Sequence, residues 1–263
     1  MYMTSGNTLI KTEEQIEMMR RSGKILSDAF RHVEAMIKPG ITTLELDKVA
    51  EEFIVGQGGY PAFKGYKVGK NTFKYCCCMS KNDAVVHGLP DDVPLKEGDI
   101  ISVDMGVNKD GWFADSAWTY PVGKVDPKIQ ELLDVTRDSL LMAVAQAKVG
   151  NHLFDIANAV QGYCEAHGFS VVRELVGHGI GRSLHEEPQV PNYIPSRFEP
   201  FLNVELKEGM TLAIEPMINM GTARVKTSRD KWTVLTADGK PSAHFEHTIV
   251  VRPNGGEILT RQA

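Results

Sequence analysis

Residues 96–104 read KEGDIISVD and residues 207–215 read KEGMTLAIE, so Lys-Glu-Gly, five further residues and an acid occur twice in the chain. In both copies, the residues between the glycine and the acid have the apolar character of a short buried strand. A second echo, residues 38–40 (KPG) against 148–150 (KVG), lies at nearly the same spacing. The repeats predict an internal duplication in which each half brings an acid to the end of a strand.

The segments before these strands also follow one order in both halves. Apolar residues at helical spacing predict two helices in the first half, over residues 13–37 and 43–54, where Thr42 or Thr43 would cap the second one. The same spacing predicts helices over residues 127–147 and 153–167 in the second half. The fold class is therefore α+β, with antiparallel strands meeting in the middle.

The length and composition indicate one domain. The chain has 263 residues, 42% of them hydrophobic, which is ample for a sizeable core. No linker of Ser and Pro separates the halves. We expect a single domain over residues 1–263, with a flexible N-terminal segment 1–10 and a duplication of about 11–124 and 125–252.

The charge pattern and the cysteines exclude several classes of protein. The net charge is −5 with both signs scattered, so the basic stripe that nucleic-acid binding requires is missing. The first 24 residues carry charges and no apolar run, and no stretch reaches the length of a membrane span. A cytoplasmic protein without membrane or nucleic-acid partners is expected. Its cysteines lack metal-ligand spacing and are expected to be reduced: Cys76, Cys77, Cys78 and Cys164.

A hairpin joins two aspartates. Residues 107–112, VNKDGW, indicate a tight turn because Asn and Asp-Gly tolerate positive φ. A turn at Lys109-Asp110 would place Asp104 directly opposite Asp115, whereas a turn at Asp110-Gly111 would leave them diagonal on one face. A three-residue loop would separate them. Two carboxylates on one face of a hairpin repel each other unless a cation lies between them, so this placement indicates a bound metal ion. The alternative is two solvated aspartates that flank the hairpin.

Further candidate ligands lie in the second half. Glu215 ends its strand, and Glu246 lies within an apolar strand predicted over residues 243–251, where a bare acid needs a partner. The sequence GHGIG at 177–181 leaves His178 on a constrained turn, although a hydrogen-bonded loop histidine is the alternative. Four carboxylates and one imidazole suit Mn²⁺, Fe²⁺, Co²⁺ or Zn²⁺. Two divalent cations would cancel the four negative charges and could activate a shared water for hydrolysis.

The acids and the histidine, in this order, resemble the metal ligands of the type I methionine aminopeptidases: Asp104, Asp115, His178, Glu215 and Glu246. The resemblance runs from about residue 11 to residue 252. Its most specific segments are VVHGLPDD (85–92), VDMG (103–106), GHGIGR (177–182), HEEP (185–188), AIEP (213–216) and FEHT (245–248). It implies their pseudo-two-fold pita-bread fold, in which a central antiparallel sheet is covered by two helix pairs. It also implies a metallo-aminopeptidase that removes the initiator methionine from nascent polypeptides and prefers a small second residue.

The resemblance assigns a role to each ligand. Asp104 would hold one metal ion, His178 and Glu215 the other, and Asp115 and Glu246 would bridge both. The family's mechanism has a hydroxide bridging two divalent metals attack the peptide carbonyl, while Glu215 carries the proton to the leaving amine. Co, Mn, Fe, Zn and Ni remain open as the metal.

Two further histidines gain roles by the same matching. His87 would contact the scissile amide nitrogen or the amino end of the substrate. His185 would hydrogen-bond the carbonyl oxygen as it becomes an oxyanion. For both, a surface histidine is the alternative. The remaining candidates are expected to be structural or solvated: Asp83, His32, His152, His167, His244 and His247.

An apolar pocket would hold the methionine side chain. The matching positions are Cys78 and Trp232, with Tyr66 and Phe73 as further candidates, and simple core packing stays open for Cys78 and Phe73. The chain departs from the family in a longer, more basic loop at residues 67–75 and in Leu184, where an aromatic residue is common. These departures put the shape of the pocket in doubt and leave the metal ligands untouched.

Two other functions remain open. A non-catalytic pita-bread module that binds peptides would typically have lost metal ligands, and all five are present. A proline-directed aminopeptidase or dipeptidase would share the ligands but usually carries an extra N-terminal domain. The expected partners are nascent peptide N-termini, at the ribosome or away from it, and the expected state is a monomer.

Overall fold

The computed structural model describes residues 9–69, 71–195 and 203–261. Most of the predicted flexible segment 1–10 lies outside these residues, and so does Lys70 of the basic loop. Ile10 is described, and it forms an antiparallel bridge with Met210. The described chain therefore begins beside the strand that leads to Glu215.

Four helices form at the predicted places: α1 (Glu13–Glu34), α2 (Thr43–Gly56), α3 (Pro127–Gln146) and α4 (Leu153–Ala166). Thr12 and Thr42 begin α1 and α2 with capping boxes, in which the threonine hydroxyl accepts from a backbone N–H and the third helical residue reaches back. The prediction of residues 13–37 was three residues too long. After the cap at Ala35 the backbone N–H groups of residues 36 and 37 bond three residues back, as in a final tight turn ahead of Pro39.

The strands are mostly short, and two long ones form the central hairpin. They are β1 (Tyr60–Pro61), β2 (Lys67–Val68), β3 (Asn71–Thr72), β4 (Cys77–Lys81), β5 (Ala84–Val86), β6 (Ile100–Lys109), β7 (Trp112–Pro121), β8 (Ser170–Val171), β9 (Gly177–Gly179), β10 (Glu186–Val190), β11 (Thr211–Ile214), β12 (Met217–Asn219), β13 (Val225–Thr227), β14 (Val234–Thr236), β15 (Ser242–His244), β16 (His247–Arg252) and β17 (Gly255–Ile258).

The strands pair in several antiparallel ladders. The first half provides a sheet in which β6 lies between β4 and β7 and also pairs with β1, and the second half provides the order β10-β9-β11-β16-β17. Every pairing between the described strands is antiparallel, as predicted. The prediction of a single strand over residues 243–251 was wrong, because Phe245 and Glu246 separate β15 from β16.

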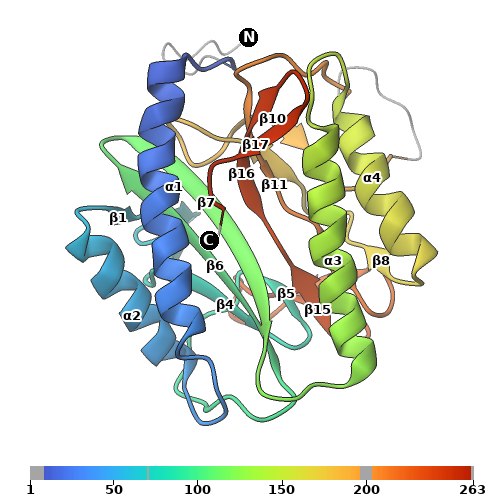
Figure 1. Cartoon of the computed structure of the whole chain (residues 1–263). Coiled ribbons are helices and arrows are strands. Elements are labelled where there is room, and N and C mark those ends of the chain that lie inside the picture. The colour runs from blue at the N-terminus through green and yellow to red at the C-terminus, as the bar shows by residue number, and fades with distance from the viewer. Residues whose placement is uncertain (1–8, 70, 196–202, 262–263) are drawn as a thin grey trace.

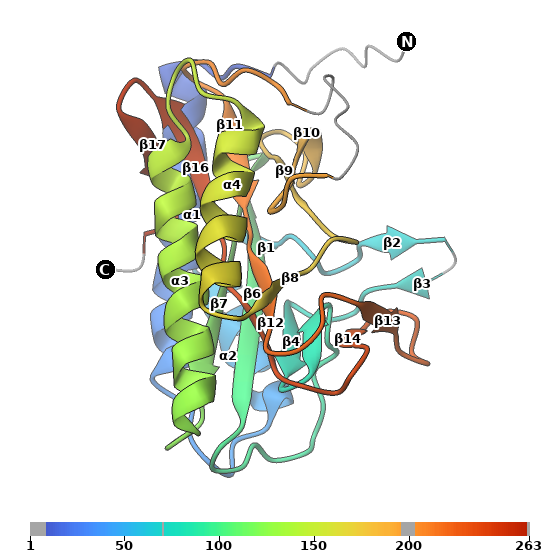
Figure 2. The ribbon, with the colours of Figure 1, turned by 90° about the vertical axis from the view of Figure 1, so that its right-hand side faces the viewer.

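The helices cover one face of these ladders. Figure 1 shows the pair α1 and α2 over one half and the pair α3 and α4 over the other, and Figure 2 shows the hairpins β2–β3 and β13–β14 projecting from the opposite face. Each helix pair packs on its own buried apolar cluster, and Trp118 of β7 packs against both clusters. The site described below therefore lies on the face without helices.

The two halves repeat a local arrangement. In the first half, the Gly40 N–H donates to the Leu95 carbonyl (2.8 Å), and in the second the Gly150 N–H donates to the Leu206 carbonyl (3.1 Å). Both glycines have positive φ, 96° and 88°, which favours glycine over other residues. The repeated sequence segments thus form equivalent turns beside equivalent strands. Their origin by duplication stays a prediction.

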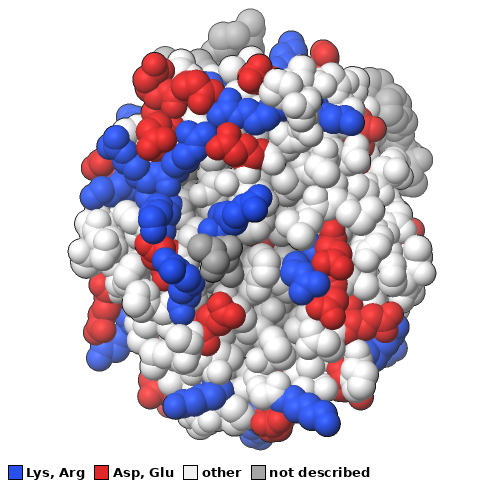
Figure 3. Space-filling view, in the orientation of Figure 1, with Lys and Arg blue, Asp and Glu red and all other residues white. Residues whose placement is uncertain are grey.

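The charged side chains are intermixed on the helical face. In Figure 3, lysine and arginine lie beside aspartate and glutamate over most of this face. Arg20 and Arg252, for example, both pair with Glu257. Among the described residues, no helix combines the length and the apolar character needed to cross a bilayer.

Candidate functional site

The β6–β7 hairpin sets the positions of the first two acids. Asp110 and Gly111 form its turn, with φ of 54° and 80°, so the second of the two predicted registers is the observed one. Asp104 pairs with Ala117 and Asp115 with Gly106, which leaves the two acids diagonal on one face of the hairpin. Both carboxylates are buried.

Hydrogen bonds join this hairpin to the second half of the chain. The Ser116 hydroxyl donates to the Glu246 carbonyl (2.6 Å), and the Glu246 N–H donates to the Ala117 carbonyl (2.8 Å). The Thr248 hydroxyl donates to the Asp115 carbonyl (2.8 Å) and accepts the N–H of the same residue (2.9 Å). These bonds fix the acids of one half against those of the other.

Glu215 and Glu246 lie where two paired strands are interrupted together. The ladder is regular at Ile214 with His247 and again at Met217 with His244, so residues 215–216 lie across from residues 245–246. Pro216 has no N–H to continue the ladder. The register is the same on both sides of the interruption, and the Phe245 N–H still donates to the Pro216 carbonyl (3.3 Å). Glu215 and Glu246 therefore lie opposite each other, and both side chains line the site.

His178 belongs to a strand, which corrects the predicted turn. It is the middle residue of β9, which lies between β10 and β11. Its flanking glycines are required by close backbone approach: a Cβ on Gly177 would lie 2.3 Å from the Ala213 carbonyl oxygen, and one on Gly179 would lie 2.1 Å from that of Glu187. Glycine here signals crowding between strands, and the crowding holds His178 against the acids.

Gly177→Ala is expected to destabilise the protein by about 1–3 kcal/mol, because the added methyl must displace backbone. Gly162→Ala is the matched control, since a Cβ there meets nothing within 4 Å inside α4 and alanine favours helix. Denaturant unfolding of both variants measures the difference. Equal stability of the two would show that strand crowding does not explain the glycine.

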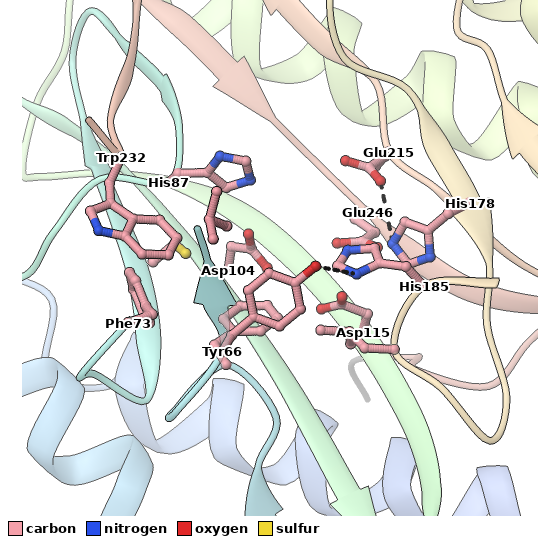
Figure 4. Close-up of a pocket in the computed structure, with 14 residues that line it drawn as sticks. Tyr66, Phe73, His87, Asp104, Asp115, His178, His185, Glu215, Trp232 and Glu246 are labelled. Carbon is pink, nitrogen blue, oxygen red and sulfur yellow. Dashed lines mark hydrogen bonds and ion pairs between the residues drawn. The ribbon is translucent and has the colours of Figure 1, made fainter. Parts of the chain in front are cut away.

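The contact between His178 and Glu215 indicates a cation. The imidazole Nδ1 lies 2.8 Å from the Gly179 carbonyl, which can only accept, so Nδ1 carries the proton. Burial lowers the pKa of His178 to about 4, so the ring is neutral and Nε2 presents a lone pair. That lone pair faces Glu215 Oε1 at 3.6 Å (Figure 4). Two lone-pair donors at this distance, the His178 Nε2 and the Glu215 Oε1, could both bind a metal ion placed between them.

The other acids are also placed as metal ligands would be. Asp104 Oδ1 and Glu246 Oε1 are buried without a hydrogen-bond partner among the described residues. Ligand atoms of Asp115, His178 and Glu246 lie within 4.8 Å of one another, as metal ligands do. Burial raises the pKa of Asp104 to about 7 and that of Glu215 to about 8. Burial and the neighbouring acids also raise the pKa values of Asp115 and Glu246 well above their usual range. Bound divalent cations would restore the ionised forms.

Every residue predicted as metal ligand, catalytic residue or pocket residue lines one cavity of about 360 Å³. Its acidic end holds the carboxylates, and its apolar end is formed by the aromatic side chains of Tyr66, Phe73 and Trp232 (Figure 4). The Phe73 ring lies 5.4 Å from Trp232, edge to face. Cys78 lies beside Asp104 on the neighbouring strand β4.

The apolar end also includes residues that the sequence did not single out. Phe63, Val68 of the altered loop and Leu184 complete its lining. Val68 lies in the short hairpin β2–β3, so the lengthened loop contributes directly to the cavity. Leu184 was named only as a departure from the family, and here it lies on the cavity wall.

The two candidate catalytic histidines flank the acids. His185 Nδ1 lies 3.3 Å from the Tyr66 hydroxyl, and its ring lies 4.4 Å from that of His178. Burial lowers the pKa of His87 to about 4 and also lowers that of His185. A second cavity, of about 480 Å³, shares His87, His178, His185 and Glu215 with the first. The histidines and Glu215 therefore lie where an apolar cavity meets a more open one.

Three supporting groups were missed. Glu186 pairs with Lys11 (2.8 Å) and accepts the N–H groups of Arg182 and Ser183, which anchors the turn that carries His185. The Asn192 amide donates to the Glu215 carbonyl (2.9 Å). His244, predicted to be structural or solvated, has Nε2 3.6 Å from Glu215 Oε2. Each acts between segments distant in sequence, and local patterns carry no signal of that.

The comparisons with known proteins agree over nearly the whole length of the chain. The model of metallopeptidase family M24 matches residues 17–253. A methionine aminopeptidase of Bacillus subtilis is 49% identical over 253 residues, covering 96% of this chain and 99% of that protein. The methionine aminopeptidase of Escherichia coli is 45% identical over 253 residues, covering 95% of this chain and 93% of that protein.

Solved structures similar to this chain include a methionine aminopeptidase and a prolidase. A methionine aminopeptidase from Thermotoga maritima has a TM-score of 0.90 at 45% identity, covering 96% of this chain and 98% of that chain. A prolidase from Pyrococcus furiosus has a TM-score of 0.75 at 22% identity, covering 97% of this chain and 66% of that chain. The second likeness shows a shared fold alone.

Proposed function

The chain belongs to metallopeptidase family M24, and from that premise we infer that it is a methionine aminopeptidase, a metal-dependent hydrolase that removes the initiator methionine of nascent polypeptides. Its fold is the pita-bread fold expected from the resemblance. The observation that carries the inference is the cluster of four acids and a histidine at one end of an apolar cavity. We also propose a preference for a small second residue, as the resemblance of the site residues implies.

We propose Asp104, Asp115, His178, Glu215 and Glu246 as the residues that hold divalent metal. Two ions fit the charge of the four acids, and their identity among Co, Mn, Fe, Zn and Ni remains a choice for experiment. When bound, such ions supply a hydroxide at neutral pH and polarise the scissile carbonyl. The protein's own contribution is to hold the acids in place, and the bound cations would favour their ionised forms.

The histidines and Glu215 would handle the substrate's polar atoms. If the Tyr66 hydroxyl donates to His185 Nδ1, His185 Nε2 carries the proton and can donate to the carbonyl oxygen as negative charge develops there. His87 would bind the amide nitrogen or the amino end of the peptide. Glu215 would take a proton from the attacking water and deliver it to the leaving amine.

The two cavities suit the two parts of the substrate. The apolar end beside Phe73 and Trp232 would take the methionine side chain, whose thioether packs well against aromatic edges. The more open cavity, which shares His87 and His185, would take the chain that follows. The scissile bond would then lie at their junction, beside Glu215.

Neither alternative function is favoured. A binding module without catalysis would not need five clustered ligands whose acids repel one another. A proline-directed peptidase finds support only in solved relatives of about one-fifth identity, which share the fold. We further propose a monomer that acts in the cytoplasm on emerging N-termini.

Peptide hydrolysis by metal-stripped protein tests the function. Met-Gly-Met-Met, Ala-Pro and Leu-Gly peptides are offered with Mn²⁺, Co²⁺, Fe²⁺ or Zn²⁺. Metal-dependent release of methionine from the first peptide alone is expected. Cleavage of Ala-Pro would move the chain to the proline-directed group, and metal binding without any cleavage would favour the binding module.

His185→Ala is expected to lower kcat by roughly 10²- to 10³-fold, as for the loss of an oxyanion donor. Metal content should be unchanged, because His185 is not among the proposed ligands. His32→Ala, on an exposed face of α1, is the matched control and should keep wild-type kcat. Methionine release at saturating metal measures both, and an unchanged kcat for His185→Ala would remove it from the mechanism.

A further inference from the structure

His244 is a buried histidine whose ring has no satisfied nitrogen. It ends β15 with only 1% of its surface exposed, and neither Nδ1 nor Nε2 has a hydrogen-bond partner among the described residues. An imidazole always carries at least one N–H, so its burial without an acceptor is costly. The fold therefore keeps this ring in place for an interaction that the ladder itself does not provide.

Backbone hydrogen bonds fix the strand face from which the His244 ring projects. The His244 N–H donates to the Thr119 hydroxyl (2.9 Å), which in turn donates to the His244 carbonyl (2.8 Å). On its other side, β15 pairs His244 with Met217 of β12. With both edges of the residue bonded, the side chain stays on the face that it shares with the acids.

The next buried histidine along the chain shows the contrast. His247 Nδ1 lies 2.9 Å from the Thr260 hydroxyl, and its ring packs on Trp118. The fold thus supplies a protein partner for one buried imidazole. For His244, Oε2 of Glu215 lies 3.6 Å from Nε2, and the Asp104 carboxylate also interacts with the ring electrostatically.

Glu215 stands between two imidazoles that differ in chemistry. Its Oε1 faces the lone pair of His178, which suits a metal ion, and its Oε2 faces His244. A carboxylate that uses one oxygen as a ligand is oriented by a donor on the other. We propose that His244 is a positioning residue, which donates its Nε2–H to Oε2 and thereby directs Oε1 toward His178 and the metal.

The proposal rests on the proposed function and deepens it, because it names the group that orients its proton carrier. His244→Ala should lower kcat on Met-Gly-Met-Met by roughly 10- to 100-fold. Its KM should change by less than about twofold, since substrate contacts are untouched. His244→Gln, whose amide can donate to the same oxygen, should recover most of the loss. A merely structural imidazole would not show this rescue.

Calorimetric titration of Mn²⁺ into the metal-free variants gives a readout besides activity. His244→Ala should weaken binding roughly tenfold with unchanged stoichiometry, and His244→Gln should restore it. His247→Ala is the matched control for loss of a buried imidazole, and it should lower stability while keeping kcat and Mn²⁺ affinity near wild type.

Three results would overturn the positioning role. They are wild-type kcat and Mn²⁺ affinity in His244→Ala, a folded His244→Gln that is no better than His244→Ala, and loss of a whole equivalent of Mn²⁺, which would make His244 a ligand. If wild-type protein releases no methionine, the proposed function fails, but the Mn²⁺ titrations still decide the role of His244.

Discussion

Glu215→Ala is expected to lower kcat by at least about three orders of magnitude and to leave the protein folded. The side chain is proposed both as ligand and as proton carrier, and general acid–base catalysis alone contributes roughly 10²- to 10⁴-fold. Folding should survive because burial raises the pKa of this carboxyl to about 8, so its ionised form costs stability when no metal is bound. Methionine release, thermal unfolding and Mn²⁺ titration together measure the three consequences.

Two further variants isolate the cause. Glu215→Gln keeps the volume and an oxygen that can accept the proposed hydrogen bond from His244, but it removes the negative charge, so it should be nearly as inactive as Glu215→Ala. Glu34→Ala, exposed at the end of α1, should keep wild-type kcat. Turnover of Glu215→Gln within tenfold of wild type would exclude Glu215 as the proton carrier.

The elements that depend on local chemistry could be predicted from the sequence. Helix periodicity and capping residues placed all four helices to within a few residues. The hairpin could be narrowed to two registers, and the positive φ at Asp110 and Gly111 selects one of them. Both registers keep Asp104 and Asp115 on one face, so the acid pair did not depend on the choice.

The errors arose where contacts are distant in sequence. Residues 243–251 have the apolar run of one strand, and the interruption at Glu246 exists because residues 215–216 lie across from it. Gly177 and Gly179 suggested a turn, since local patterns cannot show that neighbouring strands crowd both positions. His244 lies near Glu215 because β15 pairs with β12, and a single histidine in a strand gives no signal of that partner.

Removing the metal ions is expected to make the free energy of unfolding fall as the pH rises from about 6.5 to about 8.5. The pKa of Asp104 is raised to about 7 and that of Glu215 to about 8, while the unfolded values lie near 3.8 and 4.5. The folded metal-free protein therefore binds protons that the unfolded chain has released, and stability is lost as these carboxyls ionise.

The histidines confine this effect to the upper part of the pH range. The pKa values of His87 and His178 are lowered to about 4 from 6.5, so their contribution to stability is complete above pH 6.5 and is lost as the pH falls. Between about pH 4 and 6.5, a rise in pH increases stability through the histidines and decreases it through the carboxyls. Above that range only the carboxyls of these two groups still titrate. Each carboxyl that stays protonated in the folded state lowers the free energy of unfolding by about 1.4 kcal/mol per pH unit.

Urea unfolding of chelator-treated protein at a series of pH values measures the slope, and the metal-loaded protein is the control. With the acids ionised beside cations, the loaded protein should show little slope and should gain about 2.7 kcal/mol when free metal reaches a hundred times its Kd. In metal-free Glu215→Gln the free energy of unfolding should fall less steeply with pH, by the equivalent of about one proton, because one titrating carboxyl is gone. A flat profile for metal-free wild type would mean that the acids ionise together without cations, and the argument that their burial requires metal would fail.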